Sequence, residues 1–97
     1  MLMDDHKKTL SVIIPSYNEG RTICGILNRV LSVTLPFGLK KEIIVVDDGS
    51  EDETAHFVKQ FIRNNPEAPV KYIAHRVNQG KGMAIRTGIT YVTGDYV

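Results

Sequence analysis

The segment EIIVVDDGSEDET, Glu42 to Thr54, runs from apolar residues into two adjacent carboxylates and then into an acidic tail. The apolar residues Ile43 to Val46 are β-branched and suit a strand that is covered on both faces of a sheet. Asp47 and Asp48 follow directly, and each of two neighbouring carboxylates raises the free energy needed to ionise the other. Their position at the end of a buried strand therefore needs an explanation.

The acidic tail after Gly49 matches the start of a helix. Ser50 and Glu53 have the spacing of an S-x-x-E capping box, and the helix macrodipole favours negative charge in the first turn. Helix initiation accounts for the tail but not for the two aspartates before it. A carboxylate at a strand end can accept a loop amide, which is one interpretation of Asp47. Asp48 lies beside a glycine that permits close approach of another group.

The rest of the chain alternates between strand and helix patterns. Strand-like runs cover residues 10–15, 42–46, 70–74 and 95–97, and helical patterns cover residues 21–31, 55–62 and about 83–92. This order predicts an α/β fold with a Rossmann-like, three-layer parallel sheet over residues 10–97, after a flexible segment at residues 1–9. Ligands of such sheets bind outside the carboxyl ends of the strands, which selects residues 16–19, 47–50 and 75–82.

Composition restricts the class of protein further. The 97 residues suffice for one small domain, and a formal net charge of +1 argues against a nucleic-acid partner. The single cysteine, Cys24, excludes a disulfide within the chain and is interpreted as a small buried hydrophobe between apolar neighbours. No apolar run approaches the ~20 residues of a membrane-spanning helix, so we expect a soluble, cytoplasmic chain.

The first strand ends in PSYNEG, Pro15 to Gly20. Pro15 lacks a backbone donor, which a sheet tolerates where pairing stops. Tyr17 offers a flat ring that suits stacking on a planar group such as a nucleobase. Asn18 or Glu19 could equally cap the following helix.

The segment NQGKGMA, Asn78 to Ala84, has two interpretations. Its glycines and Lys81 suit a loop that cradles a phosphate at a helix N-terminus, yet the pattern matches neither well-known phosphate-loop template, so a plain turn fits equally well. His6, His56 and His75 show no metal-ligand spacing and are predicted to be surface or loop residues.

Taken together, the three strand ends resemble family 2 glycosyltransferases, the inverting enzymes of GT-A fold that include dolichyl-phosphate mannosyltransferases and related bacterial sugar transferases. The matching stretches are SVIIPSYNE (11–19), EIIVVDDGSEDET (42–54) and NQGKGMAIRTGITYVTGDYV (78–97). They cover nearly the whole chain after Thr9, and their combination is specific although no single stretch is.

The resemblance implies a nucleotide-binding site on the first motif. In the family, the proline and tyrosine of this motif line the base pocket, which corresponds here to Pro15 and Tyr17. The glutamate of the motif, here Glu19, lies beside the nucleotide.

The same resemblance implies roles for the two later motifs. The second aspartate of D-D-G-S binds the base or ribose in the family, which points to Asp48, with Asp47 supporting the loop. The N-x-G-K-G loop lies near the ribose and diphosphate, so Asn78, Gly80 and Lys81 are candidates.

The resemblance places the chemistry of transfer outside this chain. Family members carry an Asp-x-Asp motif a few residues beyond G-D-Y-V, which binds Mg²⁺ or Mn²⁺ through the donor diphosphate, and Asp95 is not that motif. The metal site, the general base and the acceptor site are therefore expected beyond Val97, with no catalytic or metal-binding residue within the chain. The chain is expected to be the N-terminal nucleotide-binding half of the GT-A domain, inactive alone.

The implied activity of the whole enzyme is transfer of a sugar, with inversion, from a UDP- or GDP-linked donor. The acceptor is a lipid phosphate, a polysaccharide or a protein, in the biosynthesis of cell-envelope polysaccharide or glycolipid. The implied location is the cytoplasm, or the inner face of the membrane for the full-length protein.

Two alternatives belong to other classes. A receiver-like signalling domain also carries paired aspartates, but it needs a phosphoacceptor aspartate at a later strand end, and Asp95 begins a strand instead. A non-catalytic nucleotide-binding or assembly module is the other alternative, because a parallel sheet cut at its last strand leaves an unpaired edge that favours a homo-oligomer.

Overall fold

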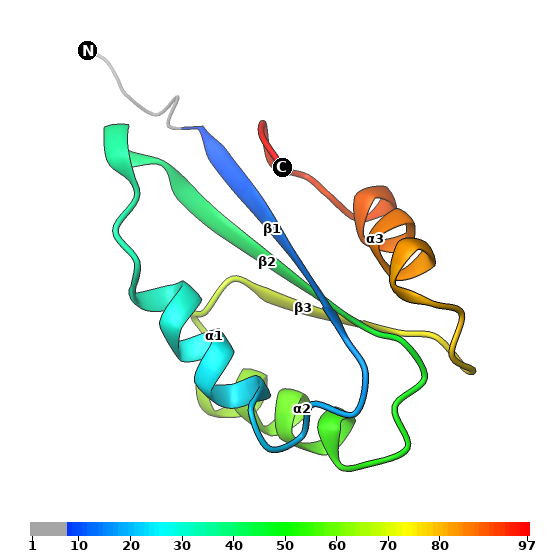
Figure 1. Ribbon diagram of the computed structural model, residues 1–97. Helices are drawn as coiled ribbons and strands as arrows, with labels where there is room; N and C mark the ends of the chain where they lie inside the picture. The colour runs from blue at the N-terminus through cyan, green and yellow to red at the C-terminus, as the bar shows by residue number, and fades with distance from the viewer. Residues whose placement is uncertain (1–7) are drawn as a thin grey trace.

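The computed structural model describes residues 8–97 as a parallel sheet with helices on both faces (Figure 1). The elements in chain order are β1 (Thr9–Ser16), α1 (Ile23–Ser32), the 3₁₀ turn η1 (Pro36–Gly38), β2 (Lys40–Asp47), α2 (Thr54–Asn64), β3 (Val70–Ala74) and α3 (Lys81–Thr90). The predicted α/β order and parallel sheet are confirmed. Of the predicted flexible segment, residues 1–7 lie outside the described part, and Thr9 is the first residue of β1.

The strands pair in the order β1-β2-β3, and all of the pairs are parallel. On the other side of β1, Tyr96 forms a parallel bridge with Leu10, and the Ser11 N–H donates to the Tyr96 carbonyl oxygen at 2.7 Å. The chain after α3 therefore returns to the free side of β1, and within residues 95–97, which were predicted to open a fourth strand, Tyr96 forms this single bridge. At its amino end, β1 therefore lies between β2 and this returning segment.

The sheet has an apolar layer on each face, and β2 contributes to both. Ile43 and Val45 face α1 and α2, whereas Ile44 and Val46 face α3 (Figure 1). All four side chains are fully buried, as the uninterrupted β-branched run predicted. Since burying one such side chain contributes roughly 1.5–3 kcal/mol, β2 is a main source of the stability of the fold.

A polar cluster fastens the returning segment at the amino end of the sheet. Glu42 of β2 accepts the Ser11 hydroxyl at 2.6 Å, the Thr93 N–H at 2.9 Å and the Lys71 ammonium at 2.8 Å, and it also accepts the Thr93 hydroxyl. Burial alone would raise the pKa of Glu42, but the hydrogen bonds from Lys71, Ser11 and Thr93 outweigh it and lower the pKa to about 2. The cluster ties all three strands to the end of the described chain.

The predicted capping box of α2 is wrong. The helix begins at Thr54, and Glu53 at its N-cap makes no side-chain capping bond. The Ser50 hydroxyl instead accepts the Asn18 N–H from the loop after β1, at 2.8 Å. Asp52, one residue before the N-cap, accepts the Thr54 N–H with its Oδ1 at 2.9 Å.

The predicted side-chain cap of α1 is also wrong. The helix begins at Ile23, its N-cap is Thr22, and no side chain caps it. Asn18 has a φ of 53°, and its Oδ1 accepts the Glu51 N–H at 2.9 Å. Glu19 contributes its backbone oxygen, which accepts the Ile23 N–H at 2.8 Å. The polar side chains of both loops therefore join the loops to each other and fix the end of β1 beside the end of β2.

Three smaller expectations are corrected or refined. Pairing does not stop at Pro15, because β1 stays paired with β2 through Ser16 and the proline nitrogen faces away from β2. The third helix begins at Lys81, two residues before the predicted Met83. Cys24 is half-buried and packs against the apolar layer under α1 and α2. Within residues 8–97, no helix combines the length and apolarity needed to span a bilayer.

Candidate functional site

Three loops meet at the carboxyl edge of the sheet and enclose a cavity of about 300 Å³. The lining residues are Pro15, Ser16, Tyr17, Glu19, Asp48, Asn78, Gly80, Lys81 and Ala84. Seven of the eight residues predicted for the nucleotide-binding site are in this set, and Asp47, whose expected role was to support the loop, is the one outside it. The structure therefore brings residues from positions 15 to 81 to one wall, as the carboxyl-end rule for parallel sheets predicted.

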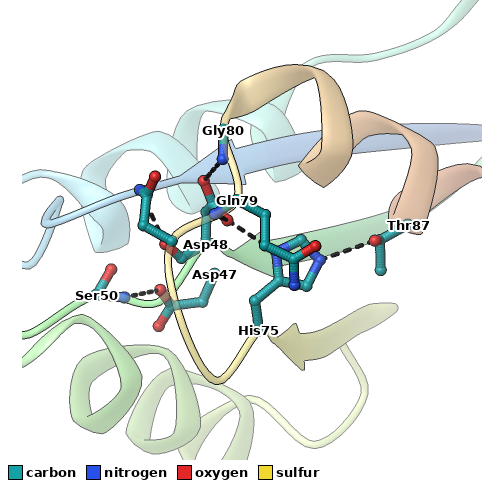
Figure 2. Close-up of polar contacts among 8 residues, drawn as sticks. Asp47, Asp48, Ser50, His75, Gln79, Gly80 and Thr87 are labelled. Atoms are coloured by element: carbon teal, nitrogen blue, oxygen red, sulfur yellow. Dashed lines mark hydrogen bonds and ion pairs between the residues drawn. The ribbon is translucent and has the colours of Figure 1, made fainter.

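The Asp48 carboxylate is the central polar group of this wall (Figure 2). Its Oδ1 accepts the Gln79 N–H and lies 2.8 Å from His75 Nδ1, and its Oδ2 accepts the Gly80 N–H at 2.8 Å. Burial raises the pKa of Asp48, but the bonds from His75, Gln79 and Gly80 outweigh it and lower the pKa. Because a carboxylate offers about four acceptor positions, this ionised group keeps roughly one for a ligand, on Oδ2.

These bonds change the interpretation of the NQGKGMA segment. The backbone amides of Gln79 and Gly80, which a phosphate loop would offer to an anion, already bind the carboxylate of Asp48. The Asn78 side chain also donates to the Asp48 backbone oxygen, at 3.2 Å. Among the predicted phosphate-facing groups, the exposed Lys81 is the one that these contacts leave to a ligand.

Gly49 is required at the junction of these loops. Its φ is +76°, and a Cβ at this position would lie 2.5 Å from Asn78 N and 2.5 Å from the Val77 carbonyl carbon. The close approach predicted beside this glycine is therefore made by the backbone of the chain itself. An alanine would suffer both a left-handed backbone and a clash with atoms that cannot rotate away.

Asp47 faces the other way and supports the loop. Its Oδ1 accepts the Ser50 N–H at 2.9 Å, and its Oδ2 accepts the Tyr72 hydroxyl at 2.6 Å. Burial, together with this bond to Asp47, raises the pKa of Tyr72. The loop-amide interpretation of Asp47 is thus confirmed, and the two adjacent carboxylates avoid each other because they point to different partners.

Tyr17 and Glu19 form the outer wall of the cavity. Tyr17 is 44% exposed and lines the cavity. The Glu19 carboxylate accepts the Thr22 hydroxyl at 2.8 Å, which orients it from the start of α1.

His75 lies in the loop directly after β3, as predicted, but its side chain is buried there. Its side chain is only 8% exposed and lies between Asp48 and the Thr87 hydroxyl, which is 2.8 Å from Nε2. The useful signal was its place directly after β3, at the same edge as the aspartates. His56 lies at the surface as predicted, and His6 is outside the described residues.

Ser16 has no assigned role from the sequence, although it lines the cavity. Its Oγ is buried, and in the described part of the chain it is the one buried side-chain oxygen or nitrogen that lacks a hydrogen-bond partner. Its neighbours in the cavity wall include Asp48 and Ala84.

Residues 8–97 contain no group of three histidine, cysteine or acidic side chains that could hold a metal ion. Asp95 does not approach the paired aspartates, because its Oδ2 accepts the N–H of Thr9, at the opposite end of β1, at 2.9 Å. The receiver alternative therefore loses the acidic residue that it required.

The fold and the cavity define an α/β protein of the Rossmann-like class, with its ligand site at the carboxyl edge of a parallel sheet. Residues 11–97 match the family model described as "Glycosyl transferase family 2", and the chain belongs to this family. This confirms the family indicated by the three sequence motifs.

Two curated relatives illustrate the range of the family. The chain is 37% identical to the dolichyl-phosphate beta-glucosyltransferase of Saccharomyces cerevisiae over 96% of its own length and 29% of that protein. It is 33% identical to the poly-beta-1,6-N-acetyl-D-glucosamine synthase of Staphylococcus epidermidis over 100% of its own length and 23% of that protein. The chain thus spans less than a third of the length of these relatives.

A solved structure with the same fold is the mannosyltransferase PcManGT from Pyrobaculum calidifontis in complex with GDP-Man and Mn²⁺. The TM-score is 0.83 at 27% sequence identity, and the match covers 94% of this chain and 26% of that one. The predicted GT-A fold is confirmed, with this chain corresponding to part of the domain.

Proposed function

We propose that this chain supplies the nucleotide-recognition part of a glycosyltransferase and binds the nucleoside diphosphate of a UDP- or GDP-linked sugar. The observation that carries this proposal is the convergence of seven predicted residues on one cavity at the carboxyl edge. In the intact protein the bound sugar is transferred to an acceptor with inversion, and the isolated chain is inactive.

Each wall of the cavity suits one part of such a ligand. The half-exposed ring of Tyr17 stacks on the base, and the remaining acceptor position of Asp48 Oδ2 takes one N–H or hydroxyl. Lys81, at the start of α3, supplies a positive charge for the diphosphate. A volume of about 300 Å³ is at the lower end of the range for ligand pockets, which suits a nucleoside better than a whole nucleotide sugar.

The intact enzyme is proposed to use Mg²⁺ or Mn²⁺, which would neutralise the leaving diphosphate. Support comes from the related mannosyltransferase, whose structure contains GDP-Man and Mn²⁺. Residues 8–97 do not fit a metal ion by themselves, so none of the roles proposed for this chain involves one.

The acceptor is proposed to be a lipid phosphate, a polysaccharide or a protein. The names of the relatives include a dolichyl-phosphate glucosyltransferase and a polysaccharide synthase, which support the first two. The proposed place of action is the cytoplasm or the inner face of a membrane, which fractionation of cells that express the intact protein tests.

The test of nucleotide recognition is calorimetric titration of UDP and GDP, with and without Mn²⁺, into the wild-type protein and the Tyr17→Ala variant. Stacking of a base on an aromatic ring contributes roughly 1–3 kcal/mol, so the variant should bind about 5- to 150-fold more weakly. Tyr91→Ala is the matched control, because Tyr91 is 48% exposed and does not line the cavity. Equal affinities for the two variants would contradict the proposal.

Inactivity of the isolated chain is tested by sugar turnover. The purified chain should transfer no sugar from a UDP- or GDP-sugar to any acceptor above the background rate. Robust turnover would show that the groups needed for transfer lie within it.

A second proposal is that the isolated chain self-associates. The described residues form a β-bridge with the outer side of β1 only at Leu10. Beside it lies a cavity of about 700 Å³ with a largely apolar lining: Leu10, Ser11, Val12, Ile13, Pro15, Lys81, Ile85 and Val97. Unpaired strand edges beside apolar surface favour pairing with another copy. A monodisperse monomer in light scattering would contradict this proposal.

A further inference from the structure

His75 joins three elements through two hydrogen bonds (Figure 2). It follows β3 directly, its Nδ1 is 2.8 Å from Asp48 Oδ1 at the end of β2, and its Nε2 is 2.8 Å from Thr87 Oγ1 on α3. The side chains of His75 and Asp48 are 8% and 5% exposed. The imidazole is thus a buried bridge between the central carboxylate of the cavity and the helix beside it.

The chemistry of the partners assigns the proton on Nδ1. The Asp48 carboxylate is ionised and can only accept, so Nδ1 of His75 carries a proton and donates to it. At Nε2 the partner is the Thr87 hydroxyl, which can donate to a ring nitrogen or accept from a ring N–H. Both ring nitrogens of His75 therefore have a hydrogen-bond partner.

The attachment of α3 to the sheet does not depend on this bridge. The Gly80 N–H already binds Asp48 at the start of α3, and Ala84 is fully buried against the sheet. At Gly88 the helix approaches β1 so closely that a Cβ would lie 2.6 Å from Ile13 Cγ2. Apolar residues could pack in place of the imidazole and hydroxyl with little change in stability. The bridge therefore acts mainly on the orientation of the carboxylate.

The orientation of Asp48 decides which acceptor position remains. Because Oδ1 takes both His75 and Gln79, Oδ2 with its single loop amide is the oxygen left for a ligand. The two oxygens of an ionised carboxylate are equivalent, so a half-turn about the Cβ–Cγ bond would change nothing. A partial rotation about this bond would move the remaining acceptor position, and the contact with His75 opposes such a rotation.

We propose that His75 and Thr87 are positioning residues that fix Asp48 Oδ2 as a single acceptor for a ring N–H of the base, and so make the site selective for uracil and guanine. This inference rests on the proposed function. Uracil and guanine carry a ring N–H, whereas cytosine and adenine present ring nitrogens with lone pairs, which a carboxylate repels. Without the bridge, Asp48 still accepts a hydrogen bond, but the site discriminates less between bases with and without a ring N–H.

The experiment compares dissociation constants of the protein for GDP against ADP and for UDP against CDP. A hydrogen bond to a charged group that is lost with the wrong base corresponds to roughly tenfold or more in affinity, so the wild type should show at least one ratio of that size. Thr87→Val keeps the volume of the side chain but removes its hydroxyl. His75→Asn keeps a donor for Asp48 but cannot reach Thr87. Both variants should lower the ratio about threefold or more.

Two further variants separate positioning from a structural effect. Thr87→Ser restores the hydroxyl and should recover the wild-type ratio. Thr90→Val makes the same exchange in the same helix, where the hydroxyl binds only the Thr87 backbone oxygen, and should leave the ratio unchanged. Unchanged ratios in both Thr87→Val and His75→Asn would overturn the inference, as would equal losses in Thr87→Val and Thr90→Val.

A readout without ligand distinguishes this inference from the proposed function. The buried Nδ1–H of His75 should give a slowly exchanging, downfield proton resonance, which Thr87→Val shifts and Thr90→Val does not. If the resonance behaves in this way but the wild type binds no nucleotide, the bridge exists while the proposed function and the assigned selectivity both fail. If nucleotides bind but the resonance does not respond to Thr87→Val, the inference fails alone.

Discussion

Replacing Gly49 by alanine should destabilise the protein and open the loop that carries Asp48. The alanine would have to adopt the φ of +76°, which costs roughly 1–3 kcal/mol for a residue with a side chain. Its Cβ would also lie 2.5 Å from Asn78 N, so this backbone must withdraw until the contact exceeds the 3.0 Å that real Cβ atoms keep.

The withdrawal of Asn78 acts on the hydrogen bonds that follow it. Gln79 and Gly80 donate to Asp48 at 2.8 Å each, and the loss of one leaves a buried charge with one donor fewer. A hydrogen bond to a charged group contributes roughly 1.5–3 kcal/mol. The expected total loss for Gly49→Ala is therefore about 2.5–6 kcal/mol, a large fraction of the roughly 5–15 kcal/mol typical of a domain of this size.

Urea unfolding followed by far-ultraviolet circular dichroism measures this loss. Gly80→Ala is the matched control, because Gly80 also has a positive φ, +97°, but no atom lies within 4 Å of the added Cβ. The control should lose only the stability that the positive φ costs a residue with a side chain. The difference in unfolding free energy between the two variants should therefore be about 1.5–3 kcal/mol. Equal losses in the two variants would refute the view that the approach of Asn78 makes Gly49 necessary.

Three further outcomes follow from the structure. Because the pKa of Glu42 falls from 4.5 to about 2 on folding, the stability that this residue provides is present above pH 4.5 and is lost as the pH falls toward 2. Urea midpoints of the wild type should therefore fall across this range, and those of Glu42→Gln should change less. Gly88→Ala should destabilise α3 by roughly 1–2 kcal/mol, because the added Cβ overpacks against β1. Gly25→Ala should stabilise α1 by about 0.5–1 kcal/mol, because no atom lies within 4 Å of its added Cβ. Midpoints of thermal unfolding that shift in the same direction for both variants would contradict this. Since burial and Asp47 raise the pKa of Tyr72, ultraviolet titration should show one tyrosine that ionises above the ordinary range near pH 10, and Tyr72→Phe should abolish that late transition.

The strands were predictable because their signal is local. The β-branched run of β2 predicted burial on both faces, and β3 has the predicted bounds of 70–74. The helix starts were not predictable in the same way. Ser50 has the sequence context of a cap, but the group it binds belongs to Asn18, 32 positions earlier. A capping rule considers the next three residues and cannot detect a competing donor in another loop.

The site shows the same division between local and distant information. The carboxyl-end rule predicted that three loops meet, and the structure places them around one cavity. The same rule selected the position of His75, but its hydrogen bonds could not be predicted, because its partners, Asp48 and Thr87, lie 27 positions before and 12 positions after it.

The position of β1 between two distant neighbours has a consequence for folding kinetics. β1 is the first strand of the described chain, yet Thr9 pairs with Lys40 on one side and binds Asp95, 86 positions away, on the other. Contacts of such high sequence separation require the closure of long loops, whose entropy slows folding. Pro15 and Tyr17 reach the cavity only when β1 has docked, so a mutation that weakens the contacts of the 93–96 segment should delay completion of the pocket even though it lies at the opposite end of the sheet.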